Sequence, residues 1–258
     1  MDVVICKDAQ EVGEVAADRW VECIDGIQTP VLGVATGSSP LALYEALAAR
    51  VQAGTLDLTH ALAFALDEYV GISPRHPESY IQVVRRHVIE PLGLNPSRVR
   101  VPEGYAADPH KAAADYDAAI KAAGGVDVQI LGIGSNGHIA FNEPYSSFAS
   151  RTRVEALTPQ TRQDNARFFD SVDEVPTHCI TQGLGTIMES RAAVLVASGK
   201  NKADAVRAMV EGPVTASCPA TILQFHPSVV VVIDEAAASE LSDPDYFRQM
   251  AAAKGLRG

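Results

Sequence analysis

Short apolar runs alternate along this chain with stretches of helical spacing, and this alternation limits the fold more than any other feature. The runs lie at residues 3–6, 30–35, 63–66, 126–131, 192–197 and 229–233. Continuous apolar runs of this length are typical of strands buried on both faces of a parallel sheet. Strands that alternate with helices are joined by right-handed crossovers. The sequence therefore predicts an α/β fold with a mainly parallel sheet.

Helical spacing follows most of the apolar runs. Residues 9–27, for example, place Val12, Val15, Ala16, Trp20 and Cys23 on one face. Further helices are expected after Pro40, at 79–89, at 109–122 and from Lys202 to Glu211. Because no repeat or linker divides a chain of this length, we expect residues 1–258 to form a single domain.

Residues 146–182 are less regular than the rest of the chain. A short helix is expected near residues 158–166. An irregular span of this length inside a compact domain is often a lid or a binding segment. We interpret it as a lid segment of the single domain.

The charge balance argues against two classes of partner. The chain has 21 Lys and Arg against 32 Asp and Glu, a net charge of −11, and no basic block. Nucleic acid and anionic membrane surfaces are therefore poor partners. A small anionic substrate would have to be held by locally placed cations and helix N-termini. No run of about eighteen apolar residues occurs, so we expect no membrane span.

The cysteines and histidines show no metal-binding spacing. The 4 cysteines are Cys6, Cys23, Cys179 and Cys218, and no pair forms a C-x-x-C motif. We expect free thiols, no metal site and no cofactor. The first residues lack a signal peptide, which predicts a soluble, cytoplasmic protein. The oligomeric state is not fixed by the sequence, and a homo-oligomer stays open.

The loop at residues 132–144 follows the fourth apolar run and is the strongest candidate for chemistry. It carries three glycines and the polar residues Asn136, His138, Asn142 and Glu143, all able to touch a substrate. Polar groups just past the carboxyl end of a buried strand mark the ligand crevice of an open α/β sheet. An imidazole held by polar partners is a tunable acid or base. We interpret this segment as the catalytic loop.

The same loop also contains a dinucleotide-type fingerprint. Gly132, Gly134 and Gly137 spell G-x-G-x-x-G, with Glu155 near the place of a ribose-binding acid. That motif needs a helix to begin at the last glycine, and Pro144 argues against one. The other alternative is a glycine-rich loop without a functional role. The cluster of polar groups argues against it, because so many polar groups seldom gather in a loop that has no function.

The segment Thr36, Gly37, Ser38, Ser39, Pro40 has the pattern of an anion site. We expect Ser39 to cap the following helix and Pro40 to be its first residue. Backbone N–H groups and hydroxyls would then point at a phosphate. A plain capped helix is an equally good interpretation of these residues alone.

Two further strand ends carry charged residues. Asp67 and Glu68 directly follow the run at 63–66, where loss of water can raise the pKa of a carboxylate and make it a stronger base. A helix cap or a solvated turn is the alternative. Lys202 and Arg167 are the cations expected to reach a substrate phosphate, with Lys200 as a competitor.

Together these segments resemble the glucosamine-6-phosphate deaminase family over nearly the whole chain. The matching motifs are residues 33–40, 66–71, 76–80, 132–144, 150–153, 166–170 and 199–203. The resemblance implies a Rossmann-like open sheet with helices on both faces. It also implies a hydrolytic deaminase of amino-sugar catabolism, which converts glucosamine 6-phosphate and water into fructose 6-phosphate and ammonia.

The resemblance further implies roles for individual residues. Asp67 would move a proton from C2 to C1 of the sugar, and His138 would serve ring opening with help from Asn136 and Glu143. The phosphate-binding positions would be Ser38, Ser39, Arg167 and Lys202, beside Thr36 and Gly37.

The sequence departs from the family pattern at two places. Some members have Asp where this chain has Asn136, which cannot ionise. Members that are activated allosterically have Lys and Thr where this chain has Glu155 and Ala156, although Arg153 matches. An acid would repel a phosphorylated activator, so we expect no activation by N-acetylglucosamine 6-phosphate.

Three other functions stay open. A 6-phosphogluconolactonase-like hydrolase would share the fold but would need no base at C2. A galactosamine-6-phosphate isomerase would differ only in the C4 epimer. A non-catalytic sugar-phosphate sensor would normally carry a DNA-binding domain, and no basic helix-turn-helix is visible.

Overall fold

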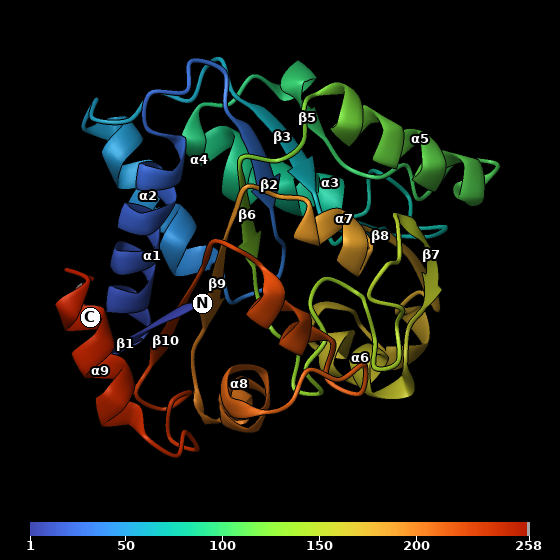
Figure 1. Ribbon diagram of the computed structural model, residues 1–258. Helices are drawn as coiled ribbons and strands as arrows, with labels where there is room; N and C mark the ends of the chain where they lie inside the picture. The colour runs from blue at the N-terminus through green and yellow to red at the C-terminus, as the bar shows by residue number, and fades with distance from the viewer. Residues whose placement is uncertain (257–258) are drawn as a thin grey trace.

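The computed structural model describes residues 1–256, and a seven-stranded sheet runs through its centre (Figure 1). Residues 257–258, the end of the expected domain, lie outside the described part. In spatial order the strands are β1 (Asp2–Cys6), β10 (Val229–Asp234), β9 (Ala192–Ala197), β6 (Val128–Leu131), β2 (Val31–Val34), β3 (Leu62–Ala65) and β5 (Val99–Arg100). Each pairing in this sheet is parallel. The predicted parallel α/β fold is therefore confirmed.

Helices pack around the sheet, with α1 and α2 on one side and α7 and α8 on the other (Figure 1). The α-helices are α1 (Ala9–Ile24), α2 (Leu41–Gln52), α3 (Tyr80–Val84), α4 (Glu90–Leu92), α5 (Pro109–Ala122), α6 (Pro159–Asn165), α7 (Leu184–Met188), α8 (Ala203–Glu211) and α9 (Pro244–Ala253). No helix within residues 1–256 is long and apolar enough to cross a bilayer.

Local sequence explains where several helices begin and end. Asp8 accepts a hydrogen bond from the backbone N–H of Glu11 at 2.9 Å and so caps α1. This helix ends at Ile24, earlier than the expected residue 27, because Gly26 takes a left-handed φ of 75°. The helix expected at 79–89 is interrupted, since a π-helical turn at Arg85–Ile89 separates α3 from α4.

A second, antiparallel sheet lies beside the first and was not predicted. Its strands are β4 (Asp67–Tyr69), β8 (His178–Thr181) and β7 (Arg153–Ala156), with β8 in the middle. Two of these strands, β7 and β8, fall in residues 146–182, where the sequence pattern is irregular. The segment also contains α6, which lies between β7 and β8 in the chain. Residues 67–69, which directly follow the third apolar run, thus form another strand, β4.

Candidate active site

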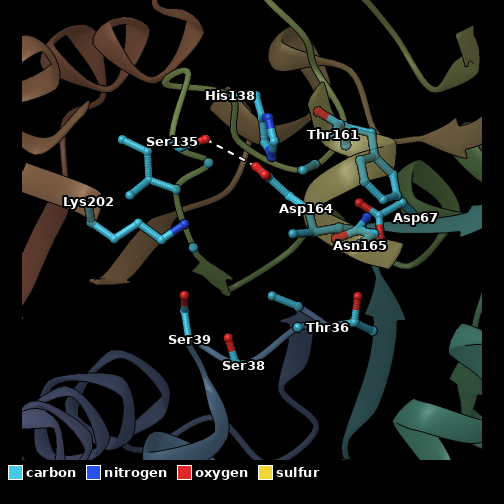
Figure 2. Close-up of a pocket in the computed structure, with 18 of the residues that line it drawn as sticks. Thr36, Ser38, Ser39, Asp67, Ser135, His138, Thr161, Asp164, Asn165 and Lys202 are labelled. Carbon is cyan, nitrogen blue, oxygen red and sulfur yellow. Dashed lines mark hydrogen bonds between the residues drawn. The ribbon is translucent and has the colours of Figure 1, made fainter. Parts of the chain in front are cut away.

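One cavity of about 430 Å³ lies where polar loops leave the carboxyl ends of β2, β3, β6 and β9 (Figure 2). The chain turns towards β3 after β2 and towards β9 after β6, so the crossovers diverge between these two neighbouring strands. Such a topological switch point is where open α/β sheets bind ligands. The cavity therefore lies where the sequence predicted the site.

The loop after β2 forms one wall of the cavity. Thr36, Gly37, Ser38 and Ser39 all line it, and Figure 2 shows the two serine side chains directed towards its interior. Gly37 has a φ of 89°, which an L side chain rarely adopts. This turn leaves backbone and hydroxyl groups facing the same space.

The expected capping of the following helix is wrong by one residue. Pro40, not Ser39, is the N-cap of α2, and no side chain bonds to the free N–H groups. The reason is that Pro40 sits in a turn with a φ of −84° and a ψ of −1°, so the regular helix begins only at Leu41. Since Ser39 does not cap the helix, its hydroxyl is available to a ligand.

Lys202 and Arg167 bring positive charge to the serine side of the cavity. Both residues line it, whereas Lys200 does not. Arg167 donates a long hydrogen bond of 3.4 Å to the hydroxyl of Ser38 and lies over the ring of Phe168. Burial lowers the pKa of Lys202, and the nearby Arg167 lowers it further. Two cations and two hydroxyl groups thus line the same part of the cavity, a combination of the kind that suits an anion.

Asp67 lies on a different wall and is almost completely buried, with 5% of its surface exposed. Burial raises the pKa of its carboxyl group well above the usual value, and the adjacent Glu68 raises it further. A carboxyl group in this state is a stronger base than one in water when it loses its proton. Its place in the cavity wall leaves it accessible to a ligand.

Glu68 has a different role, which the sequence could not separate from that of Asp67. Its carboxylate accepts hydrogen bonds from the backbone N–H groups of Tyr69, Tyr80 and Ile81, at 2.9, 3.0 and 3.1 Å. Two of these groups belong to the first turn of α3. Glu68 therefore caps α3, so the helix-cap alternative applies to Glu68, whereas Asp67 lines the cavity.

His138 lines the cavity and is backed by Glu143. Its Nδ1 lies 3.6 Å from Oε2 of Glu143, and Asn136 donates to the same oxygen at 2.9 Å. Burial alone would raise the pKa of Glu143, but the adjacent His138 and hydrogen bonds from Thr161 and Asn136 lower it to about 2. A negative charge is thus held permanently behind the imidazole.

Glycine at position 134 makes room for this imidazole. A Cβ atom built there would lie 2.3 Å from Cε1 of His138, which is closer than any real contact.

No helix follows Gly137, whose φ is 81° and which lies in a turn. The dinucleotide interpretation is therefore excluded, because the helix it requires does not form.

Of the four polar residues expected to touch a substrate, only His138 lines the cavity. Asn136 and Glu143 lie behind the imidazole. Asn142 is fully buried, and its side chain bonds to the backbone oxygens of Ile139 and Gln182. The expectation was wrong for this residue, because the chain folds back on itself after Ile139 and turns the amide inwards.

Arg153 and Glu155 form an ion pair on β7, away from the cavity wall. Arg153 also donates to Asn142 at 2.8 Å and to Ser146 at 3.1 Å. The guanidinium group is thus occupied by partners within the chain.

Several cavity residues were not singled out from the sequence. They are Tyr80, Gln160, Thr161, Asp164, Asn165 and Asn201. Asp164 accepts a hydrogen bond from Ser135 at 3.1 Å, and Asn165 donates to the hydroxyl of Tyr69 at 3.0 Å. These contacts hold α6 in the cavity wall, against the loop after β6 and against β4. A single polar residue on a short helix gives no sequence signal of such a contact.

Within residues 1–256, no three His, Cys, Asp or Glu side chains come together as a metal site needs.

Comparison with known sequences gives consistent relatives. Residues 7–232 match the family described as glucosamine-6-phosphate isomerases/6-phosphogluconolactonase. The chain is 56% identical over 248 residues to the glucosamine-6-phosphate deaminase of Cutibacterium acnes, covering 96% of this chain and 95% of that protein. It is 52% identical over 255 residues to the glucosamine-6-phosphate deaminase of Mycolicibacterium smegmatis, covering 98% of both.

Solved structures give the same grouping. A monomeric glucosamine-6-phosphate deaminase superposes with a TM-score of 0.91 at 40% identity, covering 93% of this chain and 100% of that one. The 6-phosphogluconolactonase of Trypanosoma cruzi superposes with a TM-score of 0.75 at 18% identity, covering 93% and 97%. The second likeness shows a shared fold alone.

Proposed function

This chain belongs to the family of glucosamine-6-phosphate isomerases and 6-phosphogluconolactonases, and from this premise we propose that it is a glucosamine-6-phosphate deaminase. The reaction converts glucosamine 6-phosphate and water into fructose 6-phosphate and ammonia, a step of amino-sugar catabolism. The observation that carries the proposal is the combination in one cavity of a cationic, hydroxyl-rich end with two separate acid/base groups, Asp67 and His138.

Ring opening is the first task, because the C2 proton becomes acidic only next to a free aldehyde. We assign this step to His138, which moves a proton between the ring oxygen and the anomeric hydroxyl. Glu143 stays ionised behind His138, since its pKa is about 2, and so it stabilises the imidazolium that forms during the transfer. Asn136 holds the Glu143 carboxylate in place.

Proton transfer from C2 to C1 is the second task, and we assign it to Asp67. The base removes the C2 proton to give an enolamine and returns a proton to C1, which leaves an imine at C2. Addition of water to the imine then releases ammonia and forms the ketone of fructose 6-phosphate. Burial of Asp67 suits this role, because it raises the pKa of the carboxyl group and so makes its carboxylate a stronger base.

The phosphate of the substrate would lie among Ser38, Ser39, Arg167 and Lys202. Figure 2 shows Ser38, Ser39 and Lys202 apart from Asp67, on different sides of the one cavity that all four residues line. Charge-assisted hydrogen bonds of this kind explain how a protein with a net charge of −11 can bind an anion.

Lactone hydrolysis, the rival activity in this family, is less well supported by the cavity. A lactonase needs an activated water but no base placed for a C2 proton, whereas Asp67 is a buried carboxyl group facing the ligand space.

We further propose that the enzyme acts in the cytoplasm, where sugar phosphates are metabolised and thiols stay reduced. The cysteines of the described chain are all free.

The direct test measures ammonia and fructose 6-phosphate together after purified protein is mixed with glucosamine 6-phosphate. The proposal requires both products in equal amounts. Galactosamine 6-phosphate and 6-phosphogluconolactone serve as matched substrates under the same conditions. Faster turnover of the lactone, with no ammonia from either amino sugar, would show that the proposed function is wrong.

A further inference from the structure

The two acid/base groups of the cavity come from different parts of the fold. Asp67 begins β4, directly after β3, whereas His138 lies in the loop after β6. Both groups must reach the same bound sugar, so the distance between them has to be held constant. A displacement of about 1 Å at a reacting group can cost on the order of 100-fold in rate. Some part of the structure must therefore connect the two elements rigidly.

Asn142 anchors the loop that carries His138 and Glu143. Its side-chain amide donates to the backbone oxygen of Ile139 at 3.1 Å and to that of Gln182 at 2.8 Å. Its side-chain oxygen accepts from Arg153 at 2.8 Å. With an exposed fraction of 0%, Asn142 has no water to replace these partners. The loop is thereby attached to the residue that follows β8.

Gln182 continues the connection to the strand end that carries Asp67. Its backbone N–H donates to the oxygen of Leu66 at 2.8 Å, and its side-chain amide donates to the oxygen of Ala65 at 3.0 Å. These two oxygens belong to the residues immediately before Asp67. Gln182 is 1% exposed and does not line the cavity.

We propose that Asn142 and Gln182 are positioning residues, and that this buried amide pair sets the separation of the His138 loop from Asp67. The proposal rests on the proposed function, because it concerns the two groups that act on one substrate. Neither amide touches the cavity, so the pair acts only through the backbone that it holds. Its loss changes the placement of the acid/base groups and leaves the phosphate end, which lies on other loops, unaffected.

Gln129 provides a matched control within the same molecule. It is also fully buried, and its side-chain amide also donates to a backbone oxygen, that of Ile130 at 2.9 Å. It lies within β6, and its side chain bonds within that strand rather than to the loop or to the residues before Asp67. Replacing Gln129 or Gln182 by Met removes one buried amide of similar size in each case. Only Gln182→Met removes a side-chain hydrogen bond to the strand end that carries Asp67, the one to Ala65, while the backbone bonds of residue 182 to Leu66 and Asn142 remain.

The experiment compares Gln182→Met and Gln129→Met with the unmodified enzyme. The measurements are kcat and KM for glucosamine 6-phosphate, the inhibition constant of inorganic phosphate, and the melting temperature. We expect Gln182→Met to lower kcat by roughly 100-fold, with KM and the phosphate constant within about threefold of the original. We expect Gln129→Met to keep its kcat, even where its melting temperature changes as much.

Two results would overturn the proposal. One is a kcat of Gln182→Met equal to that of Gln129→Met. Another is a parallel loss of kcat and phosphate affinity, which would show general distortion. If Gln182→Met does not fold, Gln182→Glu is judged by the same criteria, since it keeps the shape and loses the amide donor. Because all variants are compared with an active parent enzyme, a failure of the proposed function would appear separately, as an inactive parent.

Discussion

Oε2 of Glu143 lies 3.6 Å from Nδ1 of His138, and that oxygen also accepts a hydrogen bond from Asn136 at 2.9 Å. The other carboxylate oxygen accepts from the hydroxyl of Thr158 at 3.1 Å. The carboxylate is therefore fixed on both sides, and its negative charge faces the imidazole at the wall of the cavity. The arrangement connects the lid segment, through Thr158, with the group assigned to ring opening.

Glu143→Gln tests whether the charge behind His138 matters. The amide keeps the shape and one acceptor oxygen but removes the charge that stabilises a protonated imidazole. General acid/base catalysis contributes about 100- to 10,000-fold to a rate, and we expect this variant to lose roughly 100-fold in kcat. KM should change little. A kcat within twofold of the original would remove Glu143 from the mechanism.

The pH dependence of stability provides an independent test of the same carboxylate. Its pKa falls from 4.5 to about 2 on folding, so it stabilises the folded state above pH 4.5 and loses this contribution as the pH falls towards 2. The shift corresponds to roughly 3 kcal/mol of unfolding free energy. Denaturant titrations should show Glu143→Gln to be less stable at pH 6, with the difference shrinking towards pH 3. A constant difference would contradict the low pKa.

Lys202→Ala tests the phosphate end of the cavity. A charge-assisted hydrogen bond is worth about 1.5–3 kcal/mol, so KM should rise by roughly ten- to a hundredfold while kcat falls less. Lys200→Ala is the control, because Lys200 is a neighbouring lysine that does not line the cavity. Isothermal titration with inorganic phosphate measures the affinity directly. A larger effect of the Lys200 substitution would reassign the phosphate contact.

N-acetylglucosamine 6-phosphate should not activate this enzyme. Glu155 already pairs with Arg153, the residue at which the chain matches the activated members of the family. A phosphate would therefore have to displace an internal carboxylate and would still face its charge. Initial rates against glucosamine 6-phosphate, with and without saturating N-acetylglucosamine 6-phosphate, should coincide and be hyperbolic. A sigmoidal curve that becomes hyperbolic with activator would contradict this expectation.

The sequence predicted the elements whose burial is local. The apolar runs became strands of the central sheet because continuous apolar character forces burial on both faces. One polar residue or more after each of β2, β3 and β6, such as Ser38, Asp67 and His138, fell into one cavity, because parallel strands end at one edge. Their place could be expected from the sequence because each directly follows an apolar run of a mainly parallel sheet.

Contacts between distant segments could not be predicted in the same way. Asp67–Tyr69 reads as a polar loop, and it becomes a strand only because it pairs with residues 179–181 far along the chain. Asn142 reads as a polar loop residue and is buried only because of Gln182 and Arg153. The different roles of Asp67 and Glu68 likewise depend on where α3 begins, which neighbouring residues do not reveal.

Asp67→Asn should separate stability from activity. Burial raises the pKa of Asp67 because it opposes the charged carboxylate. The free energy of unfolding therefore falls as the pH rises from the unfolded pKa to the folded pKa, and the full cost is present above the folded pKa. A neutral amide of the same shape avoids that cost. We expect a higher melting temperature for Asp67→Asn at neutral pH, measured by calorimetry. A lower one would indicate that the carboxylate is held by favourable contacts instead.

Turnover of the same variant tests the central claim most directly. Ammonia release from glucosamine 6-phosphate is measured for Asp67→Asn beside the unmodified enzyme, with inorganic phosphate binding measured to show that the cavity is intact. Because the amide cannot accept the C2 proton, the account predicts unchanged phosphate affinity and a kcat lower by at least about 1,000-fold. A variant that binds phosphate normally and still releases ammonia at a rate close to the original would contradict it.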